Sequence, residues 1–274
     1  MILVFFLSAP AQGQQVKEAD KVKFASRDAE RTWLFGWWLP APAAGPRPTV
    51  IALHGCGGLY GRTRDLNERH RAMAELLRSR GFHVLFPDSF TPRGFRQLCT
   101  VPLAERRLRS SDRRVDIQGA IDWLAARPEA DRSRIVLLGW SHGGGAVLSA
   151  LNQKLNEMPV QPRAAVAFYP GCTAYARSKS GYAPVSPLLI LIGALDDWTP
   201  PAPCVALGKH ASQITVRVLP DSFHDFDHPS APVRVRNDVP NGLRPGGGVT
   251  VGSNPAAHEQ AYAEMFQFIE QKLR

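Results

Sequence analysis

The sequence has few cysteines, no long hydrophobic run and none of the common glycine-rich phosphate-binding motifs. Its 274 residues include 4 cysteines, too few for a small fold held together mainly by disulfides. No apolar segment reaches the roughly 18 residues that a membrane-spanning helix requires. Neither a Walker A pattern nor a G-x-G-x-x-G motif after a predicted strand is present. The first two absences argue against a disulfide scaffold and a membrane-spanning helix.

Acidic residues are fewer than basic ones. Lys and Arg number 33 against 24 Asp and Glu, which gives a formal net charge of +9. The arginines concentrate in residues 62–80 and 106–114, but acidic residues are interspersed among them and aromatic residues are not. We interpret both segments as solvated helix faces and expect no nucleic-acid partner. Hydrophobic residues make up 44% of the chain, which is the usage of an ordinary globular protein with a buried core.

The first residues resemble the end of a secretory signal peptide. In residues 1–11 the initiating methionine is followed by an apolar run, and Ala9-Pro10-Ala11 fits the small-x-small pattern of a cleavage site. A basic segment ahead of the apolar run is missing, since the first charge is Lys17; a buried N-terminal strand is the alternative. A signal-peptide remnant predicts export, to the periplasm or beyond the cell, and thus an oxidising compartment in which cysteines pair.

Short apolar runs alternate with amphipathic stretches along residues 12–274. Buried strands are predicted at 49–53, 82–86, 134–138, 164–168, 188–192 and 214–219. Helices are predicted at 65–80, 112–127, 144–156, 202–211 and 256–273. Runs of this kind, closed by Gly or Pro, are typical of parallel strands that are covered on both faces. The alternation predicts a single α/β domain, with a mostly parallel central sheet and helices on both faces.

Two further segments do not follow this alternation. Strands near 21–26 and 32–39 are predicted to form an antiparallel hairpin that enters the sheet. Residues 229–255 are rich in Gly, Pro and Asn and are predicted to be a long irregular loop. A loop of that length in a compact domain is usually functional or mobile, so whether it forms a lid stays open.

A G-x-S-x-G motif lies at Gly139-Trp140-Ser141-His142-Gly143, between a predicted strand and a predicted helix. That context is the one a nucleophile elbow requires, because the sharp strand-to-helix turn exposes the serine hydroxyl above the sheet. Glycines two residues on either side leave room for the neighbouring chain. Ser141 is therefore predicted to be a catalytic nucleophile.

A serine nucleophile needs a histidine base and a carboxylate that orients the histidine. Around a nucleophile elbow the chain order is Ser, then Asp or Glu, then His. Asp196 and Asp197 follow the predicted strand at 188–192, and both qualify as the acid. His224 follows the next predicted strand. All of these side chains would lie beyond the carboxyl ends of successive strands, where open α/β sheets place their ligands.

An oxyanion hole needs two backbone N–H groups that point at the developing charge. One is predicted to be the amide of His142, directly after the nucleophile. The other is predicted in the turn His54-Gly55-Cys56-Gly57-Gly58, which follows an earlier strand and resembles an HGGG-type turn. The Cys56 amide is the first candidate there, and the Gly57 amide is the second.

The motifs HGCGG, PDSF, GWSHG, GALDDWTP and PDSFHDFD, in this order, resemble those of the dienelactone hydrolase family of α/β-hydrolases. The resemblance extends from about Val50 to Phe226, with the final helix also in register. It implies an α/β-hydrolase fold and an enzyme that hydrolyses a small ester or lactone without a metal or organic cofactor. The family's acid stands four residues before the proline of G-x-x-D-x-x-x-P, which selects Asp196 over Asp197. The histidine of its H-x-F motif falls on His224.

The sequence departs from the best-known family members at the nucleophile and around the substrate. Those members use a cysteine nucleophile assisted by a glutamate near the oxyanion turn, where this chain has Ser141 and Gly55. They also hold a substrate carboxylate with two arginines. Arg93 lies one residue late for the first of these, and His228 stands at the position of the second. We therefore expect an ester hydrolase of similar architecture, with Arg93 as a candidate substrate-binding residue.

Several residues near these motifs have two interpretations. Trp140 and Trp198 are candidates for a substrate pocket, although core packing explains either one equally well. The four cysteines allow three connectivities. All four lie on loops near the predicted site, which suggests two disulfides that would brace those loops. Free buried thiols are the alternative. The suggested disulfides are Cys56–Cys99 and Cys172–Cys204.

Other functions remain open at this stage. His224, Asp225, Asp227 and His228 have the residue types of a metal site, although the chain order favours a histidine base. A serine peptidase or amidase would use the same three catalytic residues. A binding protein on a hydrolase scaffold is the alternative outside enzymology. The sequence decides neither the acyl and alcohol specificity nor the oligomeric state.

Overall fold

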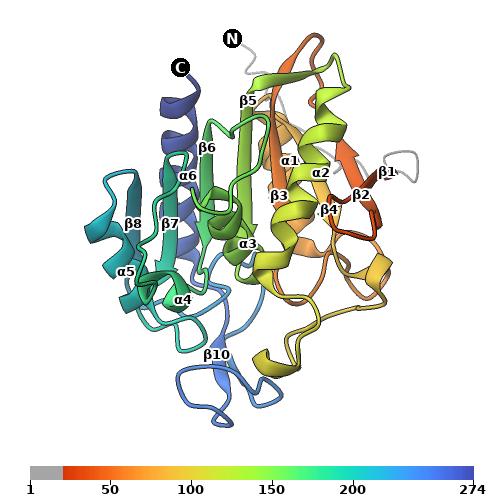
Figure 1. The fold of residues 1–274 in the computed structure, drawn as a ribbon. Coiled ribbons are helices and arrows are strands. Elements are labelled where there is room, and N and C mark those ends of the chain that lie inside the picture. Colours follow the sequence, from red (N-terminus) through yellow and green to blue (C-terminus); the bar gives the residue numbers. More distant parts are fainter. Residues whose placement is uncertain (1–20) are drawn as a thin grey trace, which may run out of the picture.

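The computed structural model describes residues 21–274; the predicted signal-peptide remnant at 1–11 lies outside them. An eight-stranded sheet runs through the described residues in the order β1-β2-β4-β3-β5-β6-β7-β8 (Figure 1). The strands are β1 (Lys21–Ala25), β2 (Trp33–Leu39), β3 (Arg47–Leu53), β4 (His83–Asp88), β5 (Ala130–Trp140), β6 (Ala164–Phe168), β7 (Leu188–Gly193) and β8 (Ile214–Leu219). β1 and β2 pair antiparallel, as does β2 with β4, and every other pairing within this sheet is parallel. The predicted entry hairpin and mostly parallel sheet are confirmed.

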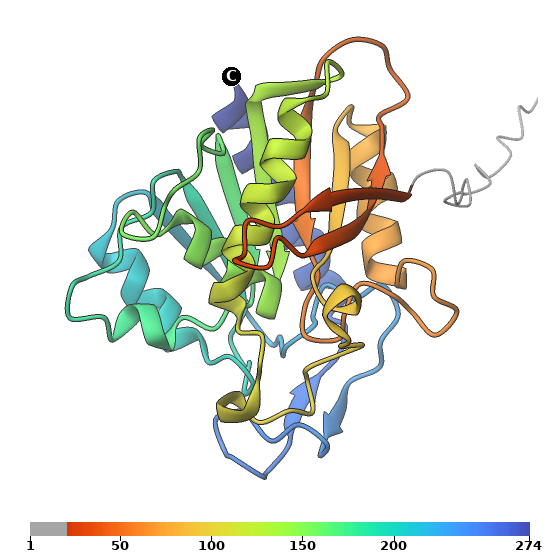
Figure 2. The same cartoon turned by 45° about the vertical axis from the view of Figure 1, so that its right-hand side comes forward.

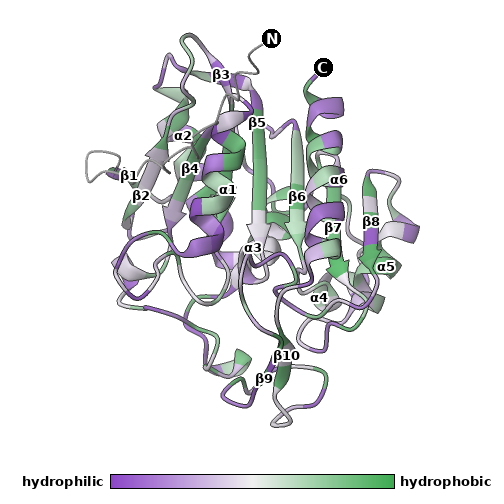
Figure 3. Ribbon diagram, turned by 180° about the vertical axis from the view of Figure 1, so that it is seen from behind, coloured by the Kyte–Doolittle hydropathy of each residue, from purple (hydrophilic) through white to green (hydrophobic). Residues whose placement is uncertain are grey.

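Helices cover both faces of the sheet. α1 and α6 lie on the face that is in front in Figure 3, while α2, α3 and α5 lie on the opposite face (Figures 1 and 2). The helices are α1 (Glu68–Ser79), α2 (Arg114–Ala125), α3 (His142–Leu151), α4 (Thr173–Ala176), α5 (Pro201–His210) and α6 (Pro255–Leu273). Short 3-10 turns η2 (Thr91–Arg93), η3 (Leu103–Glu105) and η4 (Ser110–Arg113) connect β4 to α2. Within the described residues, no helix is both long and apolar enough to cross a membrane.

Local sequence explains where these elements begin and why they pack. The Asn67 side chain caps α1 by accepting from the His70 amide at 3.0 Å, and Asn254 caps α6 in the same way ahead of Pro255. An Asn cap satisfies an amide that the first helical turn leaves without a partner. Every residue of β6 and β7 is buried, and Figure 3 shows the central strands as predominantly hydrophobic. Helices on both faces therefore bury one continuous core.

The prediction of a wholly irregular loop at 229–255 is wrong. The segment contains β9 (Arg234–Arg236) and β10 (Val249–Val251), which pair antiparallel at the end of the molecule that lies lowest in Figure 1. Val239, Val249 and Val251 form a small buried cluster against Trp198. Each strand has only three residues, too short for a periodic hydrophobic pattern to stand out between glycines and prolines.

Candidate active site

Ser141 occupies a strained turn between β5 and α3. Its backbone angles are φ 51° and ψ −110°, a combination that a non-glycine residue adopts only when the surrounding structure enforces it. The Ser141 amide donates to the Phe168 carbonyl at 2.9 Å, which ties the turn to the end of β6. A Cβ atom at Gly143 would lie 2.1 Å from the Leu53 carbonyl oxygen, and one at Gly139 would lie 2.4 Å from the Gly143 carbonyl oxygen. Both glycines are therefore required for the elbow to close.

The structure brings His224 and Asp196 together. His224 Nδ1 lies 2.8 Å from Asp196 Oδ2, and both side chains are almost fully buried. The imidazole lies between two aromatic rings, with centroids 4.4 Å from Tyr169 and 4.7 Å from Trp198. Its Nε2 atom has no hydrogen-bond partner among the described residues, and His224 lines the same cavity as Ser141. The ring is thus held through Nδ1 while Nε2 stays free to accept a proton.

Thr199 holds the Asp196 carboxylate in place, and sequence reasoning missed it. The Trp198 and Thr199 amides donate to Asp196 Oδ1 at 3.0 and 2.8 Å. The Thr199 hydroxyl lies 3.0 Å from Asp196 Oδ2 and 3.1 Å from His224 Nδ1. An Asp side chain that accepts from amides two and three residues later is a common turn motif. The D-x-x-T spacing was therefore a signal that could have identified Thr199.

Asp197, the other candidate acid, has a different role. Its carboxylate accepts from the Thr250 amide at 2.7 Å and from the Thr250 hydroxyl at 3.0 Å. Its backbone carbonyl accepts from the Leu243 amide at 2.7 Å. Asp197 therefore anchors the 229–255 segment to the end of β7, and the Gly252 amide adds a second anchor by donating to the His224 carbonyl at 3.0 Å.

Two opposing effects set the protonation of His224. Burial lowers its pKa, but the Asp196 charge and hydrogen bond raise it, and the net result is a pKa above the usual value. Burial raises the pKa of Asp225, the next residue, but the charges of Arg69 and His224 and a hydrogen bond from Arg69 together lower it to about 2. Asp225 thus remains ionised, and its charge helps to raise the pKa of His224.

The predicted oxyanion turn lies against Ser141. A Cβ atom at Gly55 would be 3.6 Å from the Ser141 Cβ, so the turn and the nucleophile are neighbours. The Cys56 and His142 amides donate no hydrogen bond to any described residue. On the far side, the Leu98 amide donates to the Cys56 carbonyl at 2.8 Å. The turn is thus fixed through its carbonyl while two amides beside Ser141 stay available.

Both suggested disulfides are confirmed. Cys56 is bonded to Cys99 and Cys172 to Cys204, and none of the cysteines is free. The first bond joins the predicted oxyanion turn to the segment that follows η2. The second joins the loop after β6 to α5. Two disulfides fit a protein that resides in an oxidising compartment.

Removing each disulfide is expected to have a different effect on catalysis. The Cys56→Ala/Cys99→Ala and Cys172→Ala/Cys204→Ala variants each open a loop, with sequence separations of 43 and 32 residues. Each is expected to lose about 2–4 kcal/mol of unfolding free energy. The variant without Cys56–Cys99 is also expected to have a lower kcat for an ester substrate, because the turn that carries the residue 56 amide is no longer held in position. Thermal melts and kcat for both double variants test this; an equal kcat loss in both would contradict it.

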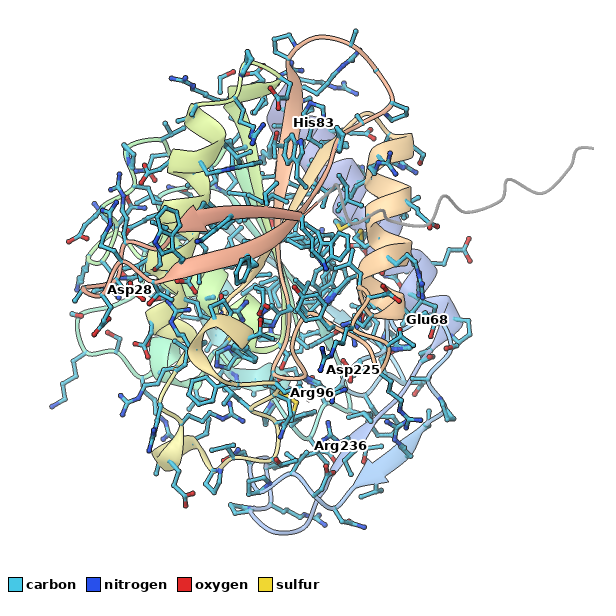
Figure 4. The ribbon with its side chains drawn as sticks, turned by 90° about the vertical axis from the view of Figure 1, so that its right-hand side faces the viewer. Asp28, Glu68, His83, Arg96, Asp225 and Arg236 are labelled. Carbon is cyan, nitrogen blue, oxygen red and sulfur yellow. A yellow bond between two sulfur atoms is a disulfide. The ribbon has the colours of Figure 1, made fainter. Side chains whose placement is uncertain are left out.

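Two cavities adjoin Ser141. The larger, of about 700 Å³, extends from Ser141 and His142 past Trp198 to the 229–255 segment. The smaller, of about 100 Å³, contains His224 and reaches Asp225 and Arg236, which Figure 4 labels in the lower part of that view. Trp198 lines both cavities. Substrate groups on either side of a scissile bond at Ser141 would each have a separate space.

Of the predicted substrate-binding residues, Trp140 and Trp198 line a cavity beside Ser141, and Arg93 does not. Trp140 lines the smaller cavity but is almost fully buried, and its Nε1–H donates to Asp227 Oδ2 at 2.7 Å. The prediction for Arg93 is wrong, since it is absent from the lining of both cavities beside Ser141. Its guanidinium donates to Asp28 at 2.7 Å and to Asp116 at 2.8 and 3.0 Å. Nη1 also donates to the Ser89 carbonyl at 2.8 Å, so both terminal nitrogens of the guanidinium are bound within the protein.

The acidic residues after His224 are hydrogen-bonded and ion-paired with side chains from other segments. Asp227 accepts from the Tyr169 hydroxyl at 2.5 Å and lies 3.5 Å from Arg69, which also pairs with Asp225 at 2.9 Å. The described residues contain no group of three or more His, Cys, Asp or Glu side chains placed to hold a metal ion. The alternation of side chains along the loop directs these carboxylates to Arg69 and Tyr169.

The eight-stranded sheet and the elbow after β5 define this molecule as an α/β-hydrolase. More specifically, the chain belongs to the dienelactone hydrolase family, whose model matches residues 37–273. The curated relatives include uncharacterized protein YfhR from Salmonella typhi and from Salmonella typhimurium, each 30% identical over 142 residues. That alignment covers 51% of this chain and 42% of each relative, so the chain spans about two fifths of their length.

Solved structures show the same fold at low sequence identity. A putative dienelactone hydrolase from Klebsiella pneumoniae has a TM-score of 0.64 and 18% identity, covering 92% of this chain and 99% of that one. A dienelactone hydrolase-like promiscuous phosphotriesterase from metagenomic libraries has a TM-score of 0.64 and 21% identity, covering 92% and 97%. A butyrate-bound esterase from Thermogutta terrifontis has a TM-score of 0.60 and 16% identity, covering 92% and 94%. The family model and these structures together place the chain in the dienelactone hydrolase family and show the α/β-hydrolase fold.

Proposed function

We propose that the protein is a serine hydrolase that cleaves carboxylic esters through Ser141, His224 and Asp196. The observation that carries this proposal is the 2.8 Å contact of His224 with Asp196, combined with a free Nε2 in the cavity that Ser141 lines. A histidine held by a carboxylate on one nitrogen and free on the other is the arrangement of a general base. The butyrate-bound esterase with the same fold is consistent with an ester substrate.

The reaction follows from these positions. His224 Nε2 takes the proton from the Ser141 hydroxyl as its oxygen attacks the ester carbonyl carbon, and the Cys56 and His142 amides hold the resulting oxyanion. Asp196 stabilises the imidazolium without accepting its proton. His224 then protonates the departing alcohol, leaving an acyl group on Ser141. Water deprotonated by His224 attacks this acyl-enzyme, which releases the acid and restores the serine.

Covalent labelling with a fluorophosphonate tests the proposal directly. The protein is expected to take up one equivalent of probe on the peptide that contains Ser141, and turnover of a short-chain p-nitrophenyl ester should fall in proportion. An adduct located on another residue would contradict Ser141 as the nucleophile. Ester turnover that persists in the fully labelled protein would contradict the mechanism. Turnover that a chelator abolishes would point to a metal-dependent hydrolase instead.

The pH profile is expected to report the raised pKa of His224. Only the neutral imidazole can act as the base, so kcat/KM should rise with pH through a midpoint above the usual histidine value. The Asp196 carboxylate raises the pKa of His224 by favouring the imidazolium, so Asp196→Asn should move this midpoint to lower pH. Measuring kcat/KM against pH for both proteins tests this. A midpoint that stays in place in Asp196→Asn would contradict the assignment.

We further propose that residues 12–274 form one exported hydrolase domain. The two disulfides support export, because such bonds persist in oxidising compartments. Expressing the full chain and comparing the molecular mass of the protein in the periplasm and medium with that in the cytoplasm tests this. Export with cleavage after Ala11 is the expected result, and retention of the uncleaved chain in the cytoplasm would contradict it.

A further inference from the structure

Arg113 is a fully buried arginine beside the predicted oxyanion hole. It lies at the end of η4, where α2 begins, and its side chain has no exposed surface. Among the described residues no carboxylate forms an ion pair with its guanidinium, although Asp116 and Asp88 attract it from a greater distance, and its Nη2 atom has no hydrogen-bond partner there. A buried charge without an ion pair costs folding free energy. Such a residue requires an explanation other than stability.

The guanidinium contacts both walls of the oxyanion hole. Its Nη1 atom donates to the His54 carbonyl at 2.7 Å and lies 3.2 Å from His142 Nδ1. The His54 carbonyl belongs to the peptide that leads into Gly55 and Cys56, so this bond fixes the orientation of the turn. His142 carries the other predicted oxyanion amide. Arg113 is thus the one side chain in these contacts that links the two donors.

The contact with His142 also fixes the state of that ring. An arginine can only donate hydrogen bonds, so His142 Nδ1 must accept and its proton must lie on Nε2. Burial and the Arg113 charge lower the pKa of His142 well below the usual value, so the ring is neutral at neutral pH. Phe90 packs edge-on against the ring at a centroid distance of 5.5 Å. The ring and its backbone amide are therefore held in one position.

The rest of the guanidinium is positioned by its surroundings. Nε donates to the Ser89 hydroxyl at 3.0 Å, and the guanidinium carbon lies 5.3 Å from the centre of the Phe90 ring. Burial lowers the pKa of Arg113 to about 10, so it remains cationic at neutral pH. A fixed cation behind two amides adds to the potential that they exert on a developing negative charge.

We propose that Arg113 is a positioning residue that aligns the Cys56 and His142 amides and favours the oxyanion electrostatically. The inference rests on the proposed function, because an oxyanion forms only if Ser141 attacks a carbonyl. In this view the protein retains a buried charge that lowers its folding stability because the charge serves catalysis. Active sites commonly tolerate such locally unfavourable features. Arg113 touches no reacting atom, so its effect should fall on kcat and not on substrate binding.

The test compares Arg113→Met with Arg93→Met. Each variant removes one guanidinium from the segment that runs from η2 to the start of α2. Arg113 is fully buried, whereas Arg93 is partly buried and paired with Asp28 and Asp116. Arg113→Met is expected to lower kcat about 10- to 100-fold, less than losing a whole oxyanion donor, while KM changes little. Its Tm should change less than that of Arg93→Met, because no carboxylate loses its ion-pair partner. Arg93→Met should keep kcat near the wild-type value.

Two further variants separate the explanations. Arg113→Lys retains the charge and is expected to recover part of the lost kcat. Ser141→Ala reports on the proposed function alone. If Ser141→Ala is inactive while Arg113→Met keeps the wild-type kcat, the inference about Arg113 is overturned and the proposed function stands. A fall in Tm for Arg113→Met as large as that of Arg93→Met, with no recovery in Arg113→Lys, would reduce Arg113 to a structural role and overturn the inference as well.

Discussion

Replacing Ser141 with alanine is expected to lower ester turnover by about 10⁴- to 10⁶-fold, the range measured when the serine of a catalytic triad is removed. The reason is that the hydroxyl forms the covalent bond of the acyl-enzyme, and no other described nucleophile lies in the strained turn after β5. Fold stability should change little, because a methyl group replaces a hydroxyl at the same backbone conformation. The measurement is kcat/KM for a p-nitrophenyl ester, with a thermal melt of both proteins.

Ser149→Ala is a matched control for this prediction. Ser149 is a buried serine in the same helix that follows Ser141, and its hydroxyl donates to the Ser111 carbonyl at 3.4 Å. Its loss should leave kcat/KM within about twofold of the wild-type value. If Ser141→Ala retained more than a hundredth of the wild-type turnover, another residue would have to supply the nucleophile. Loss of activity in both variants would indicate damage to α3 instead of loss of a reacting group.

The strands and the elbow could be predicted because each depends on a local pattern. The run at 164–168 coincides with β6 to the residue, since strands covered on both faces are continuously apolar. The run at 214–219 coincides with β8, an edge strand that is only partly buried but ends just before Pro220. The elbow needs glycine at fixed positions around Ser141, and the glycines are visible in the sequence. The carboxyl ends of parallel strands share one edge of the sheet, so these local signals were enough to bring Ser141 and His224 to one cavity.

The residues that sequence reasoning missed depend on contacts between distant segments. Arg113 belongs to an arginine-rich stretch whose pattern predicts a solvated helix face, yet it is buried at the end of η4, where it donates to the His54 carbonyl. The family resemblance makes Arg93 a candidate for substrate binding, because it stands one residue from the place of a family arginine, but Asp28 and Asp116 bind it. Each outcome is decided by a partner in a different segment of the chain, and charge alone does not reveal that partner.

The two adjacent aspartates, Asp196 and Asp197, also differ in their partners from other segments, and the structure predicts different effects of replacing each one. Asp196→Asn is expected to lower kcat about 10⁴-fold, because an amide at this position stabilises the wrong tautomer of the histidine and no longer stabilises the imidazolium. In the structure Asp196 Oδ2 contacts His224 Nδ1, whereas the Asp197 carboxylate accepts only from Thr250.

Asp197→Asn is therefore the control that differs by one position. An asparagine there still accepts from the Thr250 amide through its carbonyl oxygen, so kcat should fall by less than about tenfold. Its effect should appear instead in the 229–255 segment, as faster amide hydrogen exchange around β10, because the charged acceptor is lost. Measuring kcat for both variants decides between the two carboxylates. A larger loss of kcat in Asp197→Asn than in Asp196→Asn would mean that the acid reaches His224 from a different loop conformation, and the contact between His224 and Asp196 would not be the catalytic one.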